Sequence, residues 1–379
     1  MCAASRKYIN VLVKPTNDCN LACKYCYARS GEKKEPVMNY ETLENMISKI
    51  TELYDEVNFI WHGGEPLLAG LDFYEKVVEL EEKYGKENNT LIGNGIQTNG
   101  TLLNEKYLEF FIENKFGIGL SIDGPREVHN LTRIYKDGTG SFDDVMRAVY
   151  LMKDHGMKVG AIATLNKLNI EYYNEIYDFY KENDIGLKLN AIIPAGRAVE
   201  NDLSITPLQY ANVLIKLIDR WMDDGATFDF ITAREIIETS VDAYIVETDD
   251  KKFVVEPKRS TCAFSQSCQE NFIGIDYNGD VYPCNRWAGI EEFKYGNINT
   301  DSLEDILNNE KRKMFLNRTK ILTEKYEYCK SCEFKNKCYG GCPHNAYVVY
   351  GDILKPDPFC TAYRIAGNYV RNKLMKLLS

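Results

Sequence analysis

Short apolar runs alternate with amphipathic runs through the first half of the chain. From residue 8 to about residue 194, runs of strand length alternate with longer runs whose apolar residues recur at helical spacing. This alternation predicts an α/β fold with a parallel sheet, and six such units predict a partial (βα)6 TIM-like barrel. The predicted strands are Tyr8–Val13, Val57–Trp61, Leu91–Gln97, Gly117–Ile122, Lys158–Thr164 and Leu187–Ile193. The predicted helices are Tyr40–Tyr54, Leu71–Tyr84, Asn104–Asn114, Phe142–His155 and Ile170–Asn183.

The hydrophobic pattern changes after residue 200. Two longer runs, Pro207–Asp224 and Ala233–Val246, carry apolar residues at helical spacing and predict two helices. No chemical motif accompanies them, so we expect a helical linker region that packs beside the barrel. The aromatic residues Trp221, Phe228 and Tyr244 are expected in the core.

A polar break separates two brief apolar runs farther along. Asn278-Gly279 stands between Asn271–Asp276 and Asp280–Pro283. Asn-Gly is a preferred pair for a type I′ turn, so we predict a small β-hairpin with that turn. We expect a barrel domain at 1–200, a helical linker region at 201–260, and a further domain at 261–379 that ends in a helix.

Composition narrows the classes of function. A chain of 379 residues can bury two cores, and its net charge of −10 without a Lys/Arg cluster argues against nucleic acid as a partner. No apolar run has membrane-spanning length and Met1–Asn10 lacks the apolar stretch of a signal peptide, so we expect a cytoplasmic protein without a membrane partner. Twelve cysteines in such a chain indicate metal ligands rather than disulfides.

Three cysteines follow the first predicted strand in a CxxxCxxC spacing. They are Cys19, Cys23 and Cys26. Three thiolates can bind three irons of a [4Fe–4S] cluster, and the loop offers no fourth cysteine, so one iron would stay open for another ligand. A structural zinc ion requires four ligands, commonly two separated CxxC pairs, and fits this loop poorly.

Polar motifs follow the later strands, at the strand ends where barrel enzymes place their chemistry. Gly63 and Gly64 permit close approach of a backbone, and Glu65 offers a carboxylate to an ammonium group. A glycine turn before a helix would explain the same residues. Gln97 follows the third strand and faces the same predicted cavity, where it could contact substrate or a cofactor.

Ser121 and Asp123 follow the fourth strand. Such side chains can bind ribose hydroxyls, or they can form a turn and cap a helix. His129 and Arg133 come next, and structural and substrate-facing roles are equally compatible with their positions.

The cysteine loop and the Gly63-Gly64-Glu65-Pro66 segment together resemble the signature of the radical SAM superfamily. The resemblance implies that the open iron binds the amino and carboxylate groups of S-adenosylmethionine (SAM). It implies that one electron from the cluster then cleaves SAM to a 5′-deoxyadenosyl radical. The SAM-binding residues that the resemblance implies are Tyr25, Gly63, Gly64, Glu65, Ser121 and Asp123.

Eight further cysteines lie between residues 262 and 360 and suit two cubane clusters with four ligands each. Two zinc sites are the competing interpretation, because Cys329-x2-Cys332 is typical of half a zinc ribbon. The spacing resembles the SPASM extension of some radical SAM enzymes, which implies three [4Fe–4S] clusters in all. By that resemblance, cluster I would use Cys262, Cys268, Cys284 and Cys342, and cluster II would use Cys329, Cys332, Cys338 and Cys360. Cys2 is left without a role.

SPASM enzymes of this layout modify peptides or proteins. The resemblance therefore implies an enzyme that abstracts a hydrogen atom from a residue of such a substrate. We favour a maturase that forms thioether or other cross-links in a ribosomally made peptide. The alternative is an anaerobic sulfatase-maturating enzyme, which forms formylglycine from Cys or Ser. A non-catalytic iron–sulfur electron carrier or sensor is a third hypothesis, which the SAM-site motif disfavours.

One departure ranks the first two hypotheses. The motifs 62–70, 97–102 and 120–133 resemble those of sulfatase maturases, in which an Asp after the third auxiliary cysteine is the expected proton acceptor. Asn285 follows Cys284 here, and an amide cannot act as that base. The candidates to replace it are Asp276, Asp280 or a tyrosine, and Gln97 is a further candidate catalytic residue.

The chemistry also implies partners. We expect a peptide or protein substrate and an external one-electron donor such as flavodoxin or ferredoxin. About ten residues precede the first strand, too few for a leader-recognition domain, so a separate leader-peptide recognition protein or direct capture is expected. The target residue, the bond formed and the oligomeric state do not follow from the sequence.

Overall fold

The computed structural model describes residues 7–32, 34–240, 244–248, 251–255, 262 and 268–378. The chain divides into two compact units. The first unit comprises Met1–Ile162, Ala195–Asn201 and Gln269–Leu316, and the second comprises Ala163–Pro194, Asp202–Cys268 and Asn317–Ser379. Among the described residues, no helix is both long enough and apolar enough to cross a membrane.

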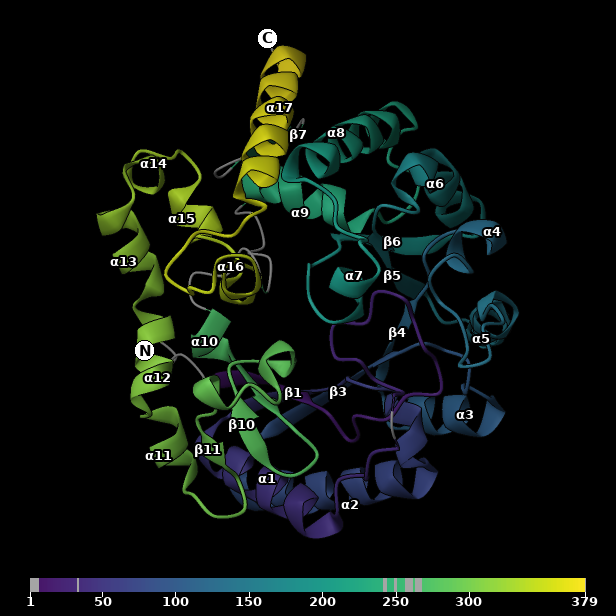
Figure 1. The fold of residues 1–379 in the computed structure, drawn as a ribbon, viewed down its shortest axis with the longest axis vertical. Coiled ribbons are helices and arrows are strands. Elements are labelled where there is room, and N and C mark those ends of the chain that lie inside the picture. The colour runs from purple at the N-terminus through teal and green to yellow at the C-terminus, as the bar shows by residue number, and fades with distance from the viewer. Residues whose placement is uncertain are drawn as a thin grey trace. The chain divides into compact units, whose positions relative to one another are not determined.

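A sheet with strand order β11-β10-β9-β1-β2-β3-β4-β5 forms the centre of the first unit (Figure 1). The neighbours from β9 through β1 to β5 pair in parallel. The strands are β1 (Tyr8–Val13), β2 (Glu56–Trp61), β3 (Leu91–Thr98), β4 (Gly117–Ser121), β5 (Val159–Leu165), β9 (Phe272–Ile275), β10 (Asp280–Tyr282) and β11 (Gly296–Asn297). The last residues of β5 belong to the second unit.

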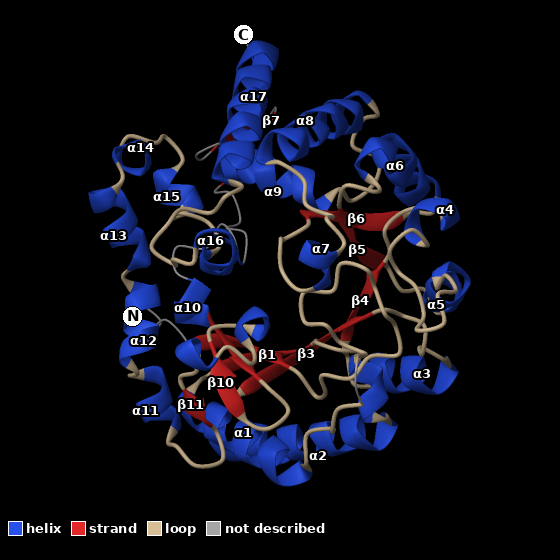
Figure 2. Ribbon diagram, viewed as in Figure 1, coloured by secondary structure: helices blue, strands red, loops and turns tan. Residues whose placement is uncertain are grey.

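Crossover helices cover the sheet, and Figure 2 shows α1, α2 and α3 along one side of it. Asn39 caps α1 by accepting a hydrogen bond from Thr42 N, and apolar positions of α1 are buried at helical spacing. Trp61 of β2 packs edge-on against Phe73 and Tyr74 of α2, at centroid distances of 5.8 and 5.9 Å. The longer helices of this unit are α1 (Tyr40–Leu53), α2 (Leu71–Asn88), α3 (Glu105–Glu113) and α5 (Phe142–Asp154).

Short helical segments complete the first unit. They are η1 (Pro66–Ala69), α4 (Arg126–His129), α7 (Arg197–Glu200), α10 (Cys268–Asn271, whose first residue belongs to the second unit), η4 (Asn285–Trp287), η5 (Glu291–Phe293), α11 (Leu303–Leu307) and α12 (Glu310–Leu316). Pro66 and the capping carboxylate of Glu65 set the start of η1, which four residues separate from the end of β2.

The hairpin prediction is confirmed for its two strands and is wrong for its turn. Strands β9 and β10 pair antiparallel, but only Gly279 has a positive φ, of 87°, whereas a type I′ turn requires positive φ at both central residues. The loop is closed by Gly279 N donating to Asp276 O and Asp276 N donating to Asp280 O, each at 2.9 Å. These bonds indicate a three-residue loop that ends in a left-handed glycine.

The second unit is mainly helical. Strand β6 (Ile185–Ala191) follows β5 in the sheet order, and α17 packs against α8 and α9. A capping box of Thr206 and Gln209 starts α8. Its helices are η2 (Ile170–Tyr172), α6 (Tyr173–Glu182), α8 (Pro207–Asp223), α9 (Ile231–Ser240), α13 (Arg318–Lys325), α14 (Glu327–Lys330), α15 (Lys335–Cys338), α16 (Pro343–Tyr350) and α17 (Cys360–Leu378).

The predicted helix Ala233–Val246 is wrong at its C-terminal end. Helix α9 stops at Ser240, and strand β7 (Tyr244–Thr248) pairs with strand β8 (Lys251–Val255). The β-branched residues Ile245, Val246 and Thr248 explain the preference for a strand. The other predicted strands and helices form within a few residues of their expected bounds.

Two of the three aromatic residues expected in the core have described side chains. Phe228 is buried, and the partly buried Trp221 donates from Nε1 to Phe228 O at 2.9 Å. Both rings also meet Phe230. The side chain of Tyr244 lies outside the described residues.

Candidate functional site

The cysteine loop follows β1 and places its three thiols in one cluster of side chains. Cys19 and Cys23 are buried with Leu21, and Cys26 and Tyr25 pack against them. Burial raises the pKa of the Cys23 thiol to about 11, so the thiolate form would require a compensating positive charge such as iron.

Two hydrogen-bond donors lie near the sulfur atom of Cys19. The N–H of Leu21 lies 3.4 Å from Cys19 Sγ, and the Asn99 side-chain amide lies 3.8 Å from the same atom. Such donors stabilise a thiolate ligand, so these residues fit an iron–sulfur cluster. Among the described residues, no group of three or more His, Cys, Asp or Glu side chains is arranged to hold a single metal ion.

Two other segments hold the cysteine loop. Ala22 N and Lys24 N donate to the carbonyls of Ile134 and Thr132, at 2.8 and 2.9 Å. On another side, Arg197 N donates to Cys26 O at 3.1 Å. The loop backbone is therefore fixed independently of any cluster.

Glu65 is a fully buried carboxylate with three donors. Leu67 N and Thr98 Oγ1 donate to Oε1 at 3.0 and 2.7 Å, and Asn99 N donates to Oε2 at 2.8 Å. Burial raises its pKa to about 7, although these hydrogen bonds oppose the shift. A bound ammonium group would favour the ionised form, and the predicted SAM contact at this position stays a prediction.

The paired glycines make room for the protein's own chain. At Gly64, with φ of 56°, an added Cβ would lie 2.1 Å from Asp18 O. At Gly63, with φ of 106°, it would lie 2.5 Å from Lys14 Cε. The cysteine loop and the Lys14 side chain therefore cross directly over this segment.

The predicted adenosine residues form a buried network. Tyr25 donates to Asp123 Oδ2 at 2.6 Å, and Thr132 donates to the same oxygen at 3.1 Å. Arg133 Nε also lies 3.0 Å from this oxygen, and its guanidinium lies 5.3 Å from the Tyr25 ring centre. Asp123 is wholly buried, so in this structure it orders the loop that carries Tyr25.

Gln97 and Ser121 lie together, as expected of neighbouring strands. Gln97 donates to Leu120 O at 2.9 Å and to Ser121 Oγ at 3.1 Å. His129 is buried, with Nε2 3.0 Å from Ser141 Oγ, and burial lowers its pKa to about 3. The contacts of His129 and Arg133 support structural roles for both.

Three neighbouring strands carry polar residues to the same level. Ile275 of β9, Val13 of β1 and Trp61 of β2 are register partners. The residues that follow them are Asp276, Lys14 and His62. Lys14 N donates to Ile275 O at 2.9 Å and His62 N donates to Val13 O at 2.8 Å, so the ladder continues into this row.

The row contains a buried carboxylate beside a buried lysine. Asp276 accepts two contacts from Asn17 Nδ2, at 3.0 and 3.3 Å, and a further bond from Tyr277 N. Lys14 is 3% exposed; burial lowers its pKa, and the nearby charge of Asp276 opposes that shift. Asn17 belongs to the segment that leads into the cysteine loop, so Asp276 lies beside that loop.

Asp280, the other carboxylate candidate, is engaged in the hairpin. Lys294 Nζ lies 2.6 Å from Oδ1, and both Asn297 and Asn278 donate to the carboxylate. Burial raises the pKa of Asp280, but these partners lower it more, so its pKa lies below the ordinary value. Its contacts support a structural role.

Asn285 lies beside the same row. The backbone of Cys284 and Asn285 passes over Gly274 of β9, where an added Cβ would lie 2.5 Å from Cys284 C. Asn285 Nδ2 donates to His62 O at 3.2 Å, and Asn285 Oδ1 is buried without a partner among the described residues.

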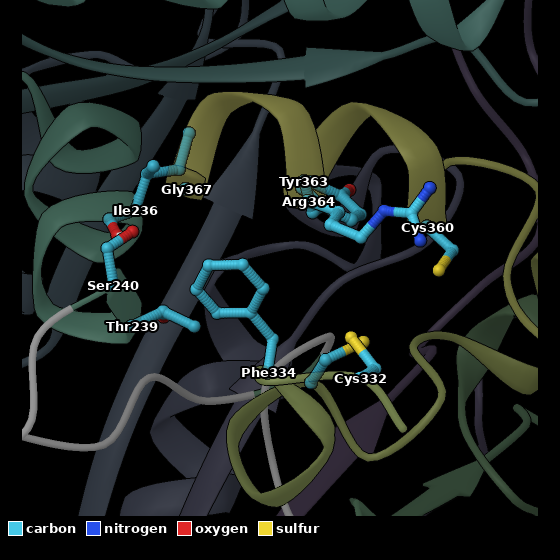
Figure 3. A pocket seen from close by; sticks show the side chains of 10 residues that line it. Ile236, Thr239, Ser240, Cys332, Phe334, Cys360, Tyr363, Arg364 and Gly367 are labelled. Atoms are coloured by element: carbon cyan, nitrogen blue, oxygen red, sulfur yellow. The ribbon is translucent and has the colours of Figure 1, made fainter. Parts of the chain in front are cut away.

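Four cysteines of the second unit surround one pocket or adjoin it. Cys332, Cys338 and Cys360 line it, and Figure 3 shows Phe334 and Arg364 around the same space. Cys329 is not in this lining, but the charges of Cys329 and Cys332 contribute to raising the pKa of Cys360, after burial. The proximity of all four thiols fits the predicted ligand set of cluster II.

Arg318 ties the loops between these cysteines. It is 4% exposed and donates to the carbonyls of Gly340, Gly341, Ile353 and Lys355, at 2.7 to 3.1 Å. Asp357 accepts from Cys342 N at 2.9 Å and from Phe359 N at 2.8 Å.

The predicted ligands of cluster I are divided between the units: Cys284 lies in the first, and Cys262, Cys268 and Cys342 lie in the second. That ligand set stays a prediction. Sequence reasoning missed Lys14, Asn17 and Asn99 and gave His62 no role. The available signal was their position after predicted strands, which is common to many turn residues.

Comparison with protein families gives two matches. Residues 13–180 match the radical SAM superfamily, and residues 262–333 match SPASM, described as an iron–sulfur cluster-binding domain. These matches confirm the predicted superfamily, the α/β class and the iron–sulfur and SAM chemistry. The number of iron–sulfur clusters does not follow from these matches.

Two relatives match along nearly the whole chain. The serine-type anaerobic sulfatase-maturating enzyme of Bacteroides thetaiotaomicron is 33% identical, over 91% of this chain and 85% of the relative. The cysteine-type enzyme of Clostridium perfringens is 30% identical, over 97% of this chain and 98% of the relative.

Solved structures that are similar to this chain include a sulfatase-maturating enzyme. Native anSMEcpe with bound AdoMet and Cp18Cys peptide is 29% identical, with a TM-score of 0.81 over 97% of this chain and 98% of that one. Streptococcus suis SuiB, bound to precursor peptide SuiA, is 17% identical, with a TM-score of 0.63 over 93% of this chain and 76% of that one, and shows a shared fold alone. The comparisons therefore support the sulfatase-maturase alternative better than the favoured peptide maturase. The chain is a radical SAM/SPASM enzyme and belongs to the family of the anaerobic sulfatase-maturating enzymes.

Proposed function

We propose that this chain oxidises a serine or cysteine residue of a sulfatase-type protein to formylglycine, with SAM as the source of the oxidising radical. Support comes from the relatives of both substrate types, which match along nearly all of this chain. The predicted departure at Asn285 remains, so the proposal requires another proton acceptor.

The match to these relatives carries the proposed function, and Asp276 is the proton acceptor in our proposal, because its position supplies the carboxylate that Asn285 lacks. Register places it in one row with Lys14 and His62, and Asn17 fixes its carboxylate. Asn285, the position where the family has the acidic residue, lies beside the same row. A carboxylate is thus present within the site although it comes from a different strand.

The cofactors are part of the proposal. Cys19, Cys23 and Cys26 would hold the cluster that reduces SAM, and that cluster would supply the electron for SAM cleavage when bound. Tyr25, Gly63, Gly64, Glu65, Ser121 and Asp123 would surround SAM. Two auxiliary clusters would use the eight later cysteines, and an external one-electron donor such as flavodoxin or ferredoxin would reduce the enzyme.

Iron content tests the cofactor count. Anaerobically reconstituted protein should contain about twelve irons, four per cubane. Replacing Cys19, Cys23 and Cys26 together by Ala should remove about four irons, whereas Cys2→Ala should remove none. An active preparation that contains zinc and no iron would refute the cluster assignment.

Mass spectrometry of a sulfatase peptide tests the function. Native enzyme, SAM and reductant should convert the target residue to an aldehyde that reacts with a hydrazine. Asp276→Asn should retain SAM cleavage but lose aldehyde formation, because the proton acceptor is removed. Asp137→Asn, at an exposed turn, is the control and should convert peptide normally.

The outcomes separate the parts of the proposal. Full conversion by Asp276→Asn would reject Asp276 as the acceptor and leave the function intact. Absence of aldehyde with native enzyme on both serine and cysteine peptides would reject the function. A cross-linked product without an aldehyde would instead support the peptide-maturase hypothesis, which Asn285 alone favours.

A further inference from the structure

Asn285 presents a buried oxygen with no hydrogen-bond donor. The residue is 5% exposed, and its Oδ1 atom has no partner among the described residues. An unpaired buried acceptor costs about 1–3 kcal/mol, which a ligand that supplies a donor can recover. The Oδ1 atom of Asn285 is therefore able to accept a hydrogen bond from a bound ligand.

The orientation of the amide follows from its neighbour. Asn285 Nδ2 lies 3.2 Å from His62 O, and a main-chain carbonyl can only accept. The NH₂ group must face that carbonyl, so Oδ1 occupies the other position of the amide. Gly274 permits this placement, because any side chain there would meet the backbone of Cys284 and Asn285.

Two proton acceptors, His62 and Asp276, belong to the row of strand ends beside Asn285. His62 has its pKa lowered to about 4 by burial and by the charges of Lys14 and Arg286, so its imidazole is neutral at pH 7. Asp276 lies in the same row of strand ends. The His62 ring lies 3.4 Å from Asn285 Nδ2, so it adjoins the amide nitrogen, and the carboxylate of the row is the acceptor left for a group bound at Oδ1.

We propose that Asn285 Oδ1 accepts the hydrogen bond of a serine hydroxyl in the substrate, and that this contact makes the enzyme selective for serine over cysteine. The inference deepens the proposed function and rests on it. A hydroxyl is a good donor, whereas a thiol is a weak one, so a neutral amide oxygen discriminates between them. A site built to bind a hydroxyl rejects analogues that lack it, because its own buried groups then stay unpaired.

The reaction balances with serine without any added water. One hydrogen atom passes from the serine β-carbon to the 5′-carbon of cleaved SAM. One electron then passes to an acceptor of the iron–sulfur class, and the hydroxyl proton leaves to Asp276. The C–O single bond becomes the C=O bond of formylglycine. Cysteine would yield a thioaldehyde, which needs one water and releases hydrogen sulfide, so the burial of Asn285 and Asp276 suits serine better.

Two peptides that differ only in the target residue test the proposal. One carries serine in a sulfatase sequence and the other carries cysteine at the same position. Native enzyme should convert the serine peptide with a kcat/KM about 10- to 100-fold higher, as the loss of one buried hydrogen bond implies. Binding measured with SAM present and reductant absent should show a preference of the same sign.

Two variants assign the effect to Asn285. Asn285→Leu removes the acceptor at similar size and should reduce the serine preference toward equality, mainly through KM. Asn285→Asp supplies a charged acceptor that can also take a thiol proton, so it should raise cysteine conversion relative to serine. The iron content and SAM binding of each variant show whether its site is assembled. If Asn285→Leu fails to fold, the serine-to-cysteine ratio of kcat/KM is compared between the native enzyme and Asn285→Asp.

The contrary results are distinct. Equal conversion of both peptides by native enzyme, a cysteine preference, or an unchanged ratio in a folded Asn285→Leu would overturn the inference while formylglycine formation stands. Absence of aldehyde on both peptides would overturn the proposed function and this inference together.

Discussion

The carbonyl oxygen of Asp18 lies 2.1 Å from the position that a Cβ at Gly64 would occupy. The cysteine loop thus crosses the glycine segment with no space for a side chain. Glu65 N donates to the same carbonyl at 2.7 Å, which fixes the crossing. The glycines of this motif therefore position the cysteine loop before any ligand binds.

Gly64→Ala should prevent cluster assembly at Cys19, Cys23 and Cys26. The added methyl group would displace the loop backbone, and the positive φ of 56° adds strain of about 1–2 kcal/mol. Gly156→Ala is a matched control, because Gly156 has φ of 71° but open space around its Cβ position. Both variants should lose thermal stability, and only Gly64→Ala should lose about four irons. Equal iron content in the two would contradict the steric account.

Glu65→Ala should weaken SAM binding and leave iron content unchanged, because Glu65 is no cluster ligand. The variant also leaves the donors Leu67 N, Thr98 Oγ1 and Asn99 N unpaired. It keeps the backbone bond from residue 65 N to Asp18 O that holds the cysteine loop. Thr98→Val removes one donor and should have a smaller effect. Isothermal titration with SAM is the measurement, and unaltered affinity in Glu65→Ala would remove this residue from the SAM site.

Glu81 predicts a pH dependence of stability outside the site. It is buried on α2, accepts from Asn94 Nδ2 at 2.7 Å, and burial raises its pKa from 4.5 to about 8. The folded state therefore binds a proton that the unfolded state has released, so stability falls as pH rises from about 4.5 to about 8. At pH 7 the cost is on the order of 3 kcal/mol.

Glu81→Gln should remove that cost and flatten this part of the pH profile. Denaturant unfolding between pH 5 and pH 8, about the range of the shift, is the measurement. Glu82→Gln, at the exposed neighbouring position, should leave the profile as it is in the native protein. A native profile that rises over this range, with no gain in Glu81→Gln, would contradict the assignment.

Arg318→Met should destabilise the second unit by about 3 kcal/mol or more. The change leaves four carbonyls without their buried donor, and it removes the cation near Asp357. Lys320→Met, at an exposed position of the same helix, is the control. Loss of auxiliary iron in Arg318→Met alone would show that the loops hold the cysteines in place. If Arg318→Met keeps the stability and iron content of the native protein, the loops between the cysteines do not need Arg318.

The sequence predicts the barrel strands well, because buried parallel strands are short apolar runs between amphipathic helices. The prediction fails at Tyr244–Thr248, where apolar residues also occur at helical spacing but β-branched side chains favour a strand, which pairs with Lys251–Val255. The predicted type I′ turn at Asn278-Gly279 does not form, because the loop closes at Asp276, one residue earlier than that turn requires.

The site divides in the same way. The spacing of the cysteines is a local pattern, so the sequence alone predicts a cluster site. The contact of Asn17 with Asp276 joins residues 259 positions apart and does not follow from the sequence. Only the register of β9 with β1 brings them together. The unpaired oxygen of Asn285 is likewise invisible in sequence, since it depends on which atom of His62 takes the amide protons.

Transfer of deuterium from substrate to SAM product tests the central claim most directly. A sulfatase peptide whose target serine carries deuterium on its β-carbon is incubated anaerobically with native enzyme, SAM and reductant. Our account predicts one deuterium in 5′-deoxyadenosine for each aldehyde formed, and one remaining deuterium on the aldehyde carbon. Production of 5′-deoxyadenosine without deuterium, together with unchanged peptide, would contradict it.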